Sequence, residues 1–314
     1  MNSIMVPLNK KLEFEDPEKI SNKIESFIRK YVYKFDRKGV ILGLSGGIDS
    51  VLVAHLCSRA LGPEKVFSVY MPEKDSDARH RKDAEATAKR LAIHFEIVDL
   101  VPFLESIGIY DKFPMNILRK IPTKRLRGFL TDAGKQFYEK VTGDNLILES
   151  RKGSNERFIS GGNAYANIKH RIRMALLHYY GEYYNLLTVG CANQTEFLTG
   201  VFVKFGIDGV ADLMPLLPLY KVQVKQIARH LGIPENIIEK PPDPDILPGF
   251  SNKTKFFEDE LQLDLVLYSL NEGMEAVEIQ KKLDVDSKYI AKIQELIKAT
   301  NHMRETPYKP EIRF

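Results

Sequence analysis

The sequence predicts a doubly wound α/β fold, in which helices flank a parallel sheet on both faces. Four short apolar runs indicate buried strands, at residues 40–44, 66–70, 95–98 and 186–189. Segments with helical periodicity separate these runs, and a regular alternation of strand and helix builds a parallel sheet. The strand ends carry glycine and polar residues, where ligands of such folds collect. We expect a single domain over residues 1–314.

The helices are predicted from their caps and their apolar spacing. Asp16 and Pro17 have the chemistry of a helix cap and first turn, and Ile20, Ile24 and Ile28 then recur on one face. Gly62 and Pro63 follow the second helix and end it. The remaining helices are predicted at 51–61, 76–91, a short turn around 103, 168–180 and 194–198.

Two regions depart from this alternation. Residues 110–160 hold many Lys and Arg side chains without a clear period, and we expect a solvated, helical and basic insertion. A lid over the ligand or a dock for a polyanion such as tRNA are the functional alternatives. A variable C-terminal segment is predicted from about residue 243.

The turn after the first strand is the most informative motif. Residues 43–50 have the sequence GLSGGIDS, and Ser45, Gly46 and Gly47 leave the backbone free to direct N–H groups toward one point. The helix that begins near Ile48 adds the positive end of its dipole. The pattern predicts a phosphate-binding turn.

Asp49 distinguishes this turn from the common nucleoside-triphosphate loop. That loop has the pattern G-x-x-x-x-G-K-[ST], whose lysine is absent here. A carboxylate beside a phosphate needs a cation, and Mg²⁺ takes oxygen ligands and usually one or two protein carboxylates. Asp49 is therefore a candidate magnesium ligand.

Composition excludes several other classes. The chain is 44% hydrophobic and 28% charged with a net charge of +4, which is too small to indicate nucleic-acid binding by itself. Cys57 and Cys191 are the two cysteines, and without a C-x-x-C pair we expect neither zinc nor an iron–sulfur cluster. We find no signal peptide and no membrane-spanning run, so a cytoplasmic location is expected.

Further motifs carry a family resemblance. The turn SGGIDS resembles that of the PP-loop ATP pyrophosphatases, which split ATP into AMP and pyrophosphate. Later blocks, NIKHRIRM, GCANQTE, VKFGIDGVADLMP, LYKVQV and IIEKPP, occur in the order found in the NAD synthetase family. The chain is thus similar to that family from the first strand to about residue 242.

The resemblance implies an ammonia-dependent amide ligase. Such an enzyme uses ATP and Mg²⁺ to adenylate the carboxylate of deamido-NAD and then transfers it to ammonia, giving NAD, AMP and pyrophosphate. It also implies a homodimer. We expect no glutaminase domain before the core, and the nitrogen would then come from free ammonia or from a separate amidotransferase. Binding to a membrane is not expected, and nucleic acid is not an expected partner.

The resemblance assigns roles to individual residues. The catalytic set is Asp49, Lys221 and Asp208. The metal carboxylates are Asp49 and Glu196. ATP would contact Gly43, Leu44, Ser45, Gly46, Gly47, Ile48, Asp49, Ser50, Cys191 and Lys221. The carboxylate substrate would contact Asn167, Arg171, Lys204, Asp208, Asp212, Lys240 and His302.

Several positions differ from the family pattern and leave alternatives open. Cys191, Val203 and Asp243 stand where the family usually has threonine, and Met303 replaces a lysine. The segment GIDGVAD is one residue longer than its family counterpart. The alternatives are a paralogue that adenylates another carboxylate, a tRNA-modifying PP-loop enzyme, and a non-catalytic nucleotide-binding protein.

Overall fold

The computed structural model describes most of the chain. The described residues are 8–112, 115–118, 120–121, 146–153, 156–209, 211–240, 259–305, 308–310 and 312. The expectations for most of the basic insertion and for Asp243 lie outside these residues.

The centre of the fold is a parallel sheet. Within the described residues its strands are β1 (Gly39–Gly43), β2 (Val66–Tyr70), β3 (His94–Ile97) and β4 (Leu186–Val189), in the order β3-β2-β1-β4. The chain moves outward from β1 to β3 and then crosses to the other side of β1. The carboxyl ends of β1 and β4 therefore flank the point where strand order reverses, which is where open α/β sheets bind ligands.

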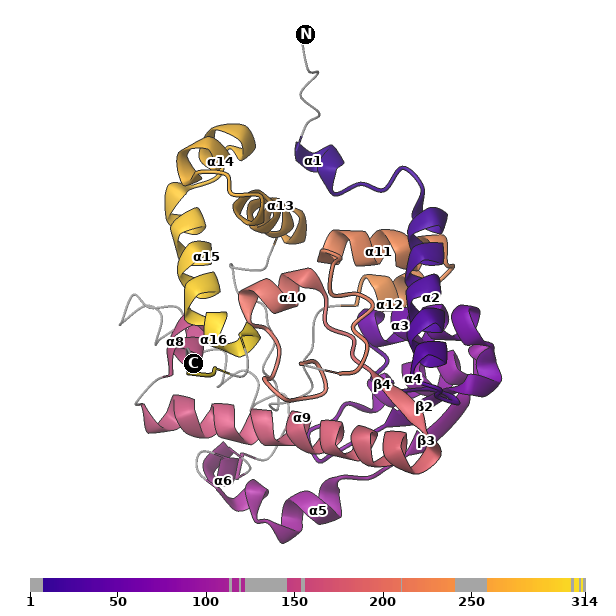
Figure 1. Ribbon diagram of the computed structural model, residues 1–314. Coiled ribbons are helices and arrows are strands. Elements are labelled where there is room, and N and C mark those ends of the chain that lie inside the picture. Colours follow the sequence, from indigo (N-terminus) through magenta and orange to yellow (C-terminus); the bar gives the residue numbers. More distant parts are fainter. Residues whose placement is uncertain are drawn as a thin grey trace.

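Helices cover both faces of this sheet (Figure 1). On one face α2 (Pro17–Lys34), α3 (Ile48–Leu61), α4 (Ala78–Leu91) and α11 (Lys221–His230) pack around alternate β1 residues such as Leu42. On the other face α5 (Val101–Ser106) and the long α9 (Arg157–Tyr184) pack around Ile41. The alternation of Ile41 and Leu42 between two cores follows from the two-residue period of a strand.

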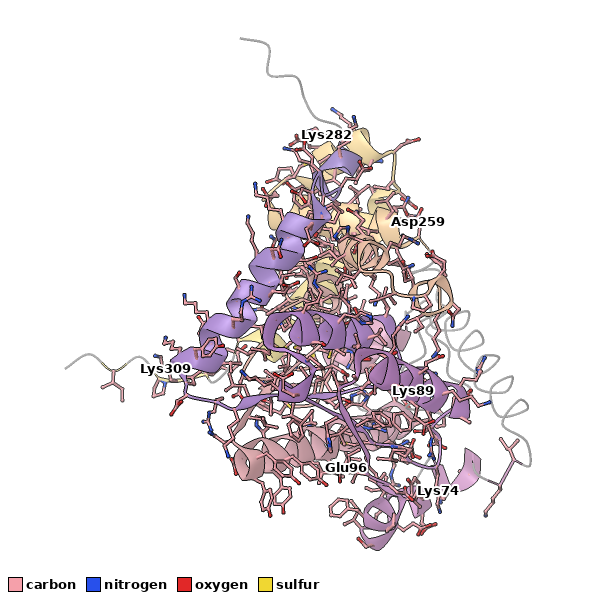
Figure 2. The ribbon with its side chains drawn as sticks, turned by 90° about the vertical axis from the view of Figure 1, so that its right-hand side faces the viewer. Lys74, Lys89, Glu96, Asp259, Lys282 and Lys309 are labelled. Carbon is pink, nitrogen blue, oxygen red and sulfur yellow. The ribbon has the colours of Figure 1, made fainter. Side chains whose placement is uncertain are left out.

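The C-terminal helices form a third core beside the sheet. α13 (Glu260–Asn271), α14 (Ala276–Leu283) and α15 (Ser287–Ala299) bury Val266 and Ile290. Figure 2 shows this part, with Asp259 and Lys282, at the opposite end from Lys74 and Glu96. The shorter elements are α1 (Leu8–Lys11), η1 (Pro63–Lys65), η2 (Ile109–Asp111), α6 (Met115–Leu118), α8 (Leu146–Lys152), α10 (Gln194–Thr199), α12 (Glu235–Ile238) and α16 (Asn301–Arg304).

The predicted fold class is confirmed, and the largest error in the predicted bounds concerns one helix. The strands at 66–70 and 186–189 match the prediction, and the other two differ by one residue at each end. The helix predicted at 168–180 instead runs from Arg157 to Tyr184. Burial of Ile159 and Tyr165 stabilises its first turns against the low helix propensity of the glycines between them. None of the helices in the described part is long and apolar enough to span a bilayer.

Candidate active site

The phosphate-binding turn is held in shape by its own side chains. Ser45 N donates to Ser50 Oγ at 3.2 Å, and Gly47 N donates to Ser45 Oγ at 3.2 Å. Ser50 Oγ in turn lies 3.0 Å from Gly47 O. Gly46 has a φ of +79°, and a Cβ there would lie 2.4 Å from the backbone oxygen of His80. The turn is therefore preorganised, and only glycine fits at its tightest point.

Asp49 lies in the first turn of α3 and pairs with residues from distant segments. Lys221, the first residue of α11, places its Nζ 2.6 Å from Asp49 Oδ2. Asn193 Nδ2 donates to Asp49 Oδ1 at 2.9 Å. The charges of Asp49 and Glu196 raise the pKa of Lys221 despite the opposing effect of burial. Lys221 is therefore a fixed cation beside the phosphate-binding turn.

Glu196 brings a second carboxylate to this cation. Its Oε1 lies 3.8 Å from Lys221 Nζ, and its Oε2 accepts a hydrogen bond from Asn193 N at 3.3 Å as part of a capping box. Burial, together with the charge of Asp49, raises the pKa of Glu196 to about 8, although 29% of its side chain remains exposed. Two carboxylates thus face one positive charge.

This pair of acids fits a magnesium ion. Asp49 and Glu196 are oxygen ligands that converge on the same ammonium group, and Mg²⁺ is commonly bound by one or two carboxylates with water completing its shell. Within the described residues, no three His, Cys, Asp or Glu side chains gather as ligands for another metal.

Asp264 of α13, which the sequence pattern does not single out, supports this arrangement through hydrogen bonds to Thr195 and Val222. It is fully buried and accepts hydrogen bonds from Thr195 Oγ1 at 2.5 Å and Val222 N at 2.9 Å. Thr195 Oγ1 also accepts from Lys221 N at 2.9 Å. Burial raises the pKa of Asp264 to about 6. The only signal in the sequence is a lone acid inside the apolar run LQLDLVL.

Lys240 contacts the phosphate-binding turn. Its Nζ lies 2.6 Å from Asp83 Oδ2 on α4 and 3.4 Å from Gly46 O. The family resemblance implies that Lys240 contacts the carboxylate substrate, whereas in the structure it lies beside the turn predicted to bind ATP.

Asp208 and Asp212 have different surroundings. Asp208 Oδ2 lies 2.7 Å from His170 Nδ1, and although burial acts to raise its pKa, the charges of His170 and Arg173 keep that pKa below its usual value. Its charge also contributes to the raised pKa of Glu196, which places it near that carboxyl group. Asp212 instead accepts two hydrogen bonds from Thr188 of β4, both at 2.8 Å.

Cys191 lies two residues after the end of β4 and is partly buried. Burial, with the charges of Asp208 and Asp49, raises its pKa well above the usual value. The residue is therefore a neutral thiol in the crevice, without the hydroxyl that the family pattern has there.

The other predicted substrate residues line a separate cavity. Asn167, Arg171, Lys204 and His302 surround a volume of about 210 Å³. Arg171 Nε donates to Lys204 O at 3.2 Å, and Lys204 Nζ donates to His302 O at 2.9 Å. Arg173, two residues from Arg171, instead donates from its Nε to Met71 O at 3.1 Å, so the two arginines contact different segments.

Comparison with known proteins identifies the family. A family model described as NAD synthase matches residues 20–113 and 138–307. The chain belongs to the NAD synthase family. It is 33% identical over 279 residues to the NH(3)-dependent NAD(+) synthetase of Thermotoga maritima. These aligned residues cover 89% of this chain and 94% of that protein. The enzyme of the same name from Hyperthermus butylicus is 32% identical over 313 residues, 98% of this chain and 95% of the relative.

Solved structures share the fold. The NH3-dependent NAD synthetase of Campylobacter jejuni, solved with a nitrate ion, has a TM-score of 0.65 and 26% identity over 95% of this chain and all of that one. An NMN synthetase from Francisella tularensis has a TM-score of 0.67 over 96% of this chain and all of that one, and at 22% identity it supports the fold alone. Membership of this family agrees with the fold and with the resemblance seen in the motifs.

Proposed function

We propose that this chain is an ammonia-dependent NAD synthetase. It would join ammonia to the carboxylate of deamido-NAD and convert ATP into AMP and pyrophosphate. The observation that carries the proposal is the convergence of the phosphate-binding turn, Asp49, Glu196 and Lys221 at the reversal point of the sheet, in a member of the NAD synthase family. The names of the curated relatives support the same reaction.

The chemistry explains why a phosphate-binding turn serves an amide ligase. A carboxylate is a poor electrophile because its negative charge repels nucleophiles. A carboxylate oxygen therefore attacks the α-phosphorus of ATP, and the bond to pyrophosphate breaks. Ammonia then attacks the carbonyl carbon of the mixed anhydride, AMP leaves with the electron pair of the broken C–O bond, and the nitrogen loses a proton to give the amide.

The residues supply position and charge for the first step. The turn from Ser45 to Gly47 and the N-terminus of α3 would hold the departing pyrophosphate, and Lys221 would neutralise its charge. Bound Mg²⁺, held by Asp49 and Glu196, would neutralise further negative charge on the phosphates. These groups are fixed before reaction, so little reorganisation is needed.

Asp208 is the candidate for the second step. Its lowered pKa keeps it ionised at neutral pH, and it lies near Glu196, so this side of the crevice carries negative charge. Such a carboxylate would attract the ammonium ion and orient it. The side chain is 37% exposed, which leaves it accessible from the crevice.

We extend the proposal to assembly and location. α9 presents a row of exposed aromatic side chains, including Tyr179 and Tyr183, which supports a homodimer formed over this helix. Two cysteines without a disulfide support a cytoplasmic location.

The test is a turnover assay with purified protein, ATP, Mg²⁺ and ammonium, with and without deamido-NAD. The proposal predicts AMP and NAD in equal amounts, and only when deamido-NAD is present. AMP formed only with another carboxylate would replace the proposal by the paralogue. AMP formation that depends on RNA would indicate the tRNA-modifying class, and ATP binding without any turnover would indicate a nucleotide-binding protein.

A further inference from the structure

The loop that carries Asp208 is attached to α9 at three points. Arg171 Nε donates to Lys204 O at 3.2 Å, and Ile207 N donates to His170 O at 3.1 Å. The third point is a side-chain contact, in which His170 Nδ1 lies 2.7 Å from Asp208 Oδ2. His170 therefore provides two of the three attachments, one through its backbone and one through its imidazole.

The same loop also packs directly on His170. A Cβ at Gly206 would lie 2.9 Å from His170 Cβ and 2.8 Å from Val203 Cβ, which is closer than real Cβ contacts allow. The segment GIDGVAD, which begins at Gly206, is one residue longer than its family counterpart. The position of Asp208 therefore does not follow from the family pattern, and in this chain the contact with His170 determines it.

The stability of the fold does not explain the imidazole of His170. Its side chain is 10% exposed, and Nε2 is buried without a hydrogen-bond partner among the described residues. The contact of Nδ1 with Asp208 is close but poorly aligned for a hydrogen bond, as contacts of catalytic groups often are until substrate binds. Buried polar atoms without partners lower stability, and an apolar side chain of similar size would avoid this cost.

Asp208 needs an anchor of this kind for the amidation step. Its side chain is 37% exposed, so without a fixed contact it would sample several rotamers in water. An ammonium ion bound to a mobile carboxylate meets the carbonyl carbon less often in the right geometry. The contact of Oδ2 with His170 restricts these rotamers and leaves Oδ1 as an acceptor for ammonium.

We propose that His170 is a positioning residue for the amidation step, and that it holds Asp208 of the lengthened loop where this carboxylate binds ammonium. His170 acts through Asp208 and does not itself touch the nucleophile, because both of its ring nitrogens are buried. The inference rests on the proposed function for the role of ammonium as the nucleophile.

The test compares His170→Leu, His170→Asn and His230→Leu. Leucine removes both ring nitrogens of His170, whereas asparagine keeps an N–H donor near the position of Nδ1. His230 is the matched control because its Nε2 also lies 2.7 Å from a carboxylate oxygen, Glu18 Oε2, but at an exposed position. It occupies the other end of a ten-residue helix from Lys221, about 13 Å away along the axis.

Thermal melting separates a role in function from a role in the fold. His170→Leu should melt no lower than the unaltered protein, because it removes a buried atom that has no partner. A lower melting temperature of this variant would show that the imidazole stabilises the fold, and it would overturn the inference.

Two assays then separate amidation from adenylation. Turnover at varied ammonium and saturating ATP, Mg²⁺ and deamido-NAD gives the KM for ammonium. Exchange of labelled pyrophosphate into ATP, with deamido-NAD and without ammonium, measures adenylation alone. His170→Leu should raise the KM for ammonium by about tenfold or more, the scale for a misplaced reacting group, and leave the KM for ATP and the exchange rate unchanged. His170→Asn should fall between His170→Leu and the unaltered protein, and His230→Leu should behave as the unaltered protein.

The outcomes distinguish the inference from the proposed function. An unchanged KM for ammonium in His170→Leu, or an equal loss of pyrophosphate exchange, would overturn the inference. If the unaltered protein aminates another carboxylate in place of deamido-NAD, the proposed function alone is wrong, and the same comparison with that carboxylate decides the role of His170. The absence of ammonium-dependent turnover with every carboxylate would overturn both.

Discussion

Replacing Lys169 with methionine should destabilise the fold more than any loss of a surface charge. Lys169 on α9 is completely buried, and its Nζ lies 2.8 Å from Glu73 Oε1 and 2.9 Å from Asp75 Oδ2. Tyr110 and Tyr165 donate hydrogen bonds to the same two acids. Methionine keeps most of the volume but leaves two carboxylates buried without their cation.

The expected magnitude follows from this burial. Breaking a buried ion pair by removal of one partner costs about 3–5 kcal/mol. The entropy of unfolding is about 2.1 cal/mol/K per residue, so for a chain of 314 residues each kcal/mol shifts Tm by about 1.5 °C. The melting temperature of Lys169→Met should therefore fall by about 4–8 °C.

Lys152→Met is the matched control. Lys152 also pairs with two acids, Glu149 and Glu295, at 3.2 and 2.7 Å, but its side chain is 39% exposed. Exposed ion pairs contribute about 0–1 kcal/mol, so this variant should melt within a few degrees of the unaltered protein. Differential scanning calorimetry at pH 7.5 measures both. Equal melting temperatures for the two variants would refute the reasoning from burial.

Two further predictions concern the active site. Since burial raises the pKa of Asp264 from 3.8 to about 6, the native state keeps a proton that the unfolded state releases, and stability should fall as pH rises from about 4 to 6. Urea unfolding at pH 4 and pH 6.5 should show this slope, and Asp264→Asn should reduce it to the part that comes from the raised pKa of Glu196; an unchanged slope would contradict the assignment. Glu196→Gln should raise the Mg²⁺ concentration for half-maximal ATP turnover by about tenfold or more, with the fold intact because glutamine also completes a capping box. An unchanged Mg²⁺ titration would show that Glu196 does not bind the metal.

The strands and the phosphate-binding turn could be predicted because their signals are local. An apolar run followed by glycine and small polar residues determines both where β1 ends and how the chain turns, so the sequence of residues 43–50 is enough to predict this turn. Asp49 and Glu196 each follow the end of a strand, and the ends of parallel strands meet at one edge of a sheet. This rule explains why both acids lie near Lys221 in the structure.

The supporting contacts could not be predicted because they join distant segments. Asn193 and Asp264 contact residues that lie 144 and 69 positions away, at Asp49 and Thr195. A capping asparagine and an acid in an apolar run have ordinary local explanations. Only the packing of the helices in the folded chain shows that Asn193 contacts Asp49 and that Asp264 contacts Thr195. His170 is one of seven histidines, and its spacing alone gives no reason to single it out.

The central claim is that Asp49, at the start of α3, is required for capture of the departing pyrophosphate. Asp49→Asn preserves the size of the side chain and removes the charge that faces Lys221. With ATP, Mg²⁺, ammonium and deamido-NAD, AMP formation by this variant should fall by about a hundredfold or more, the scale for loss of a main electrostatic contact in a transition state, while its circular dichroism stays unchanged. AMP formation at the rate of the unaltered protein would contradict the claim.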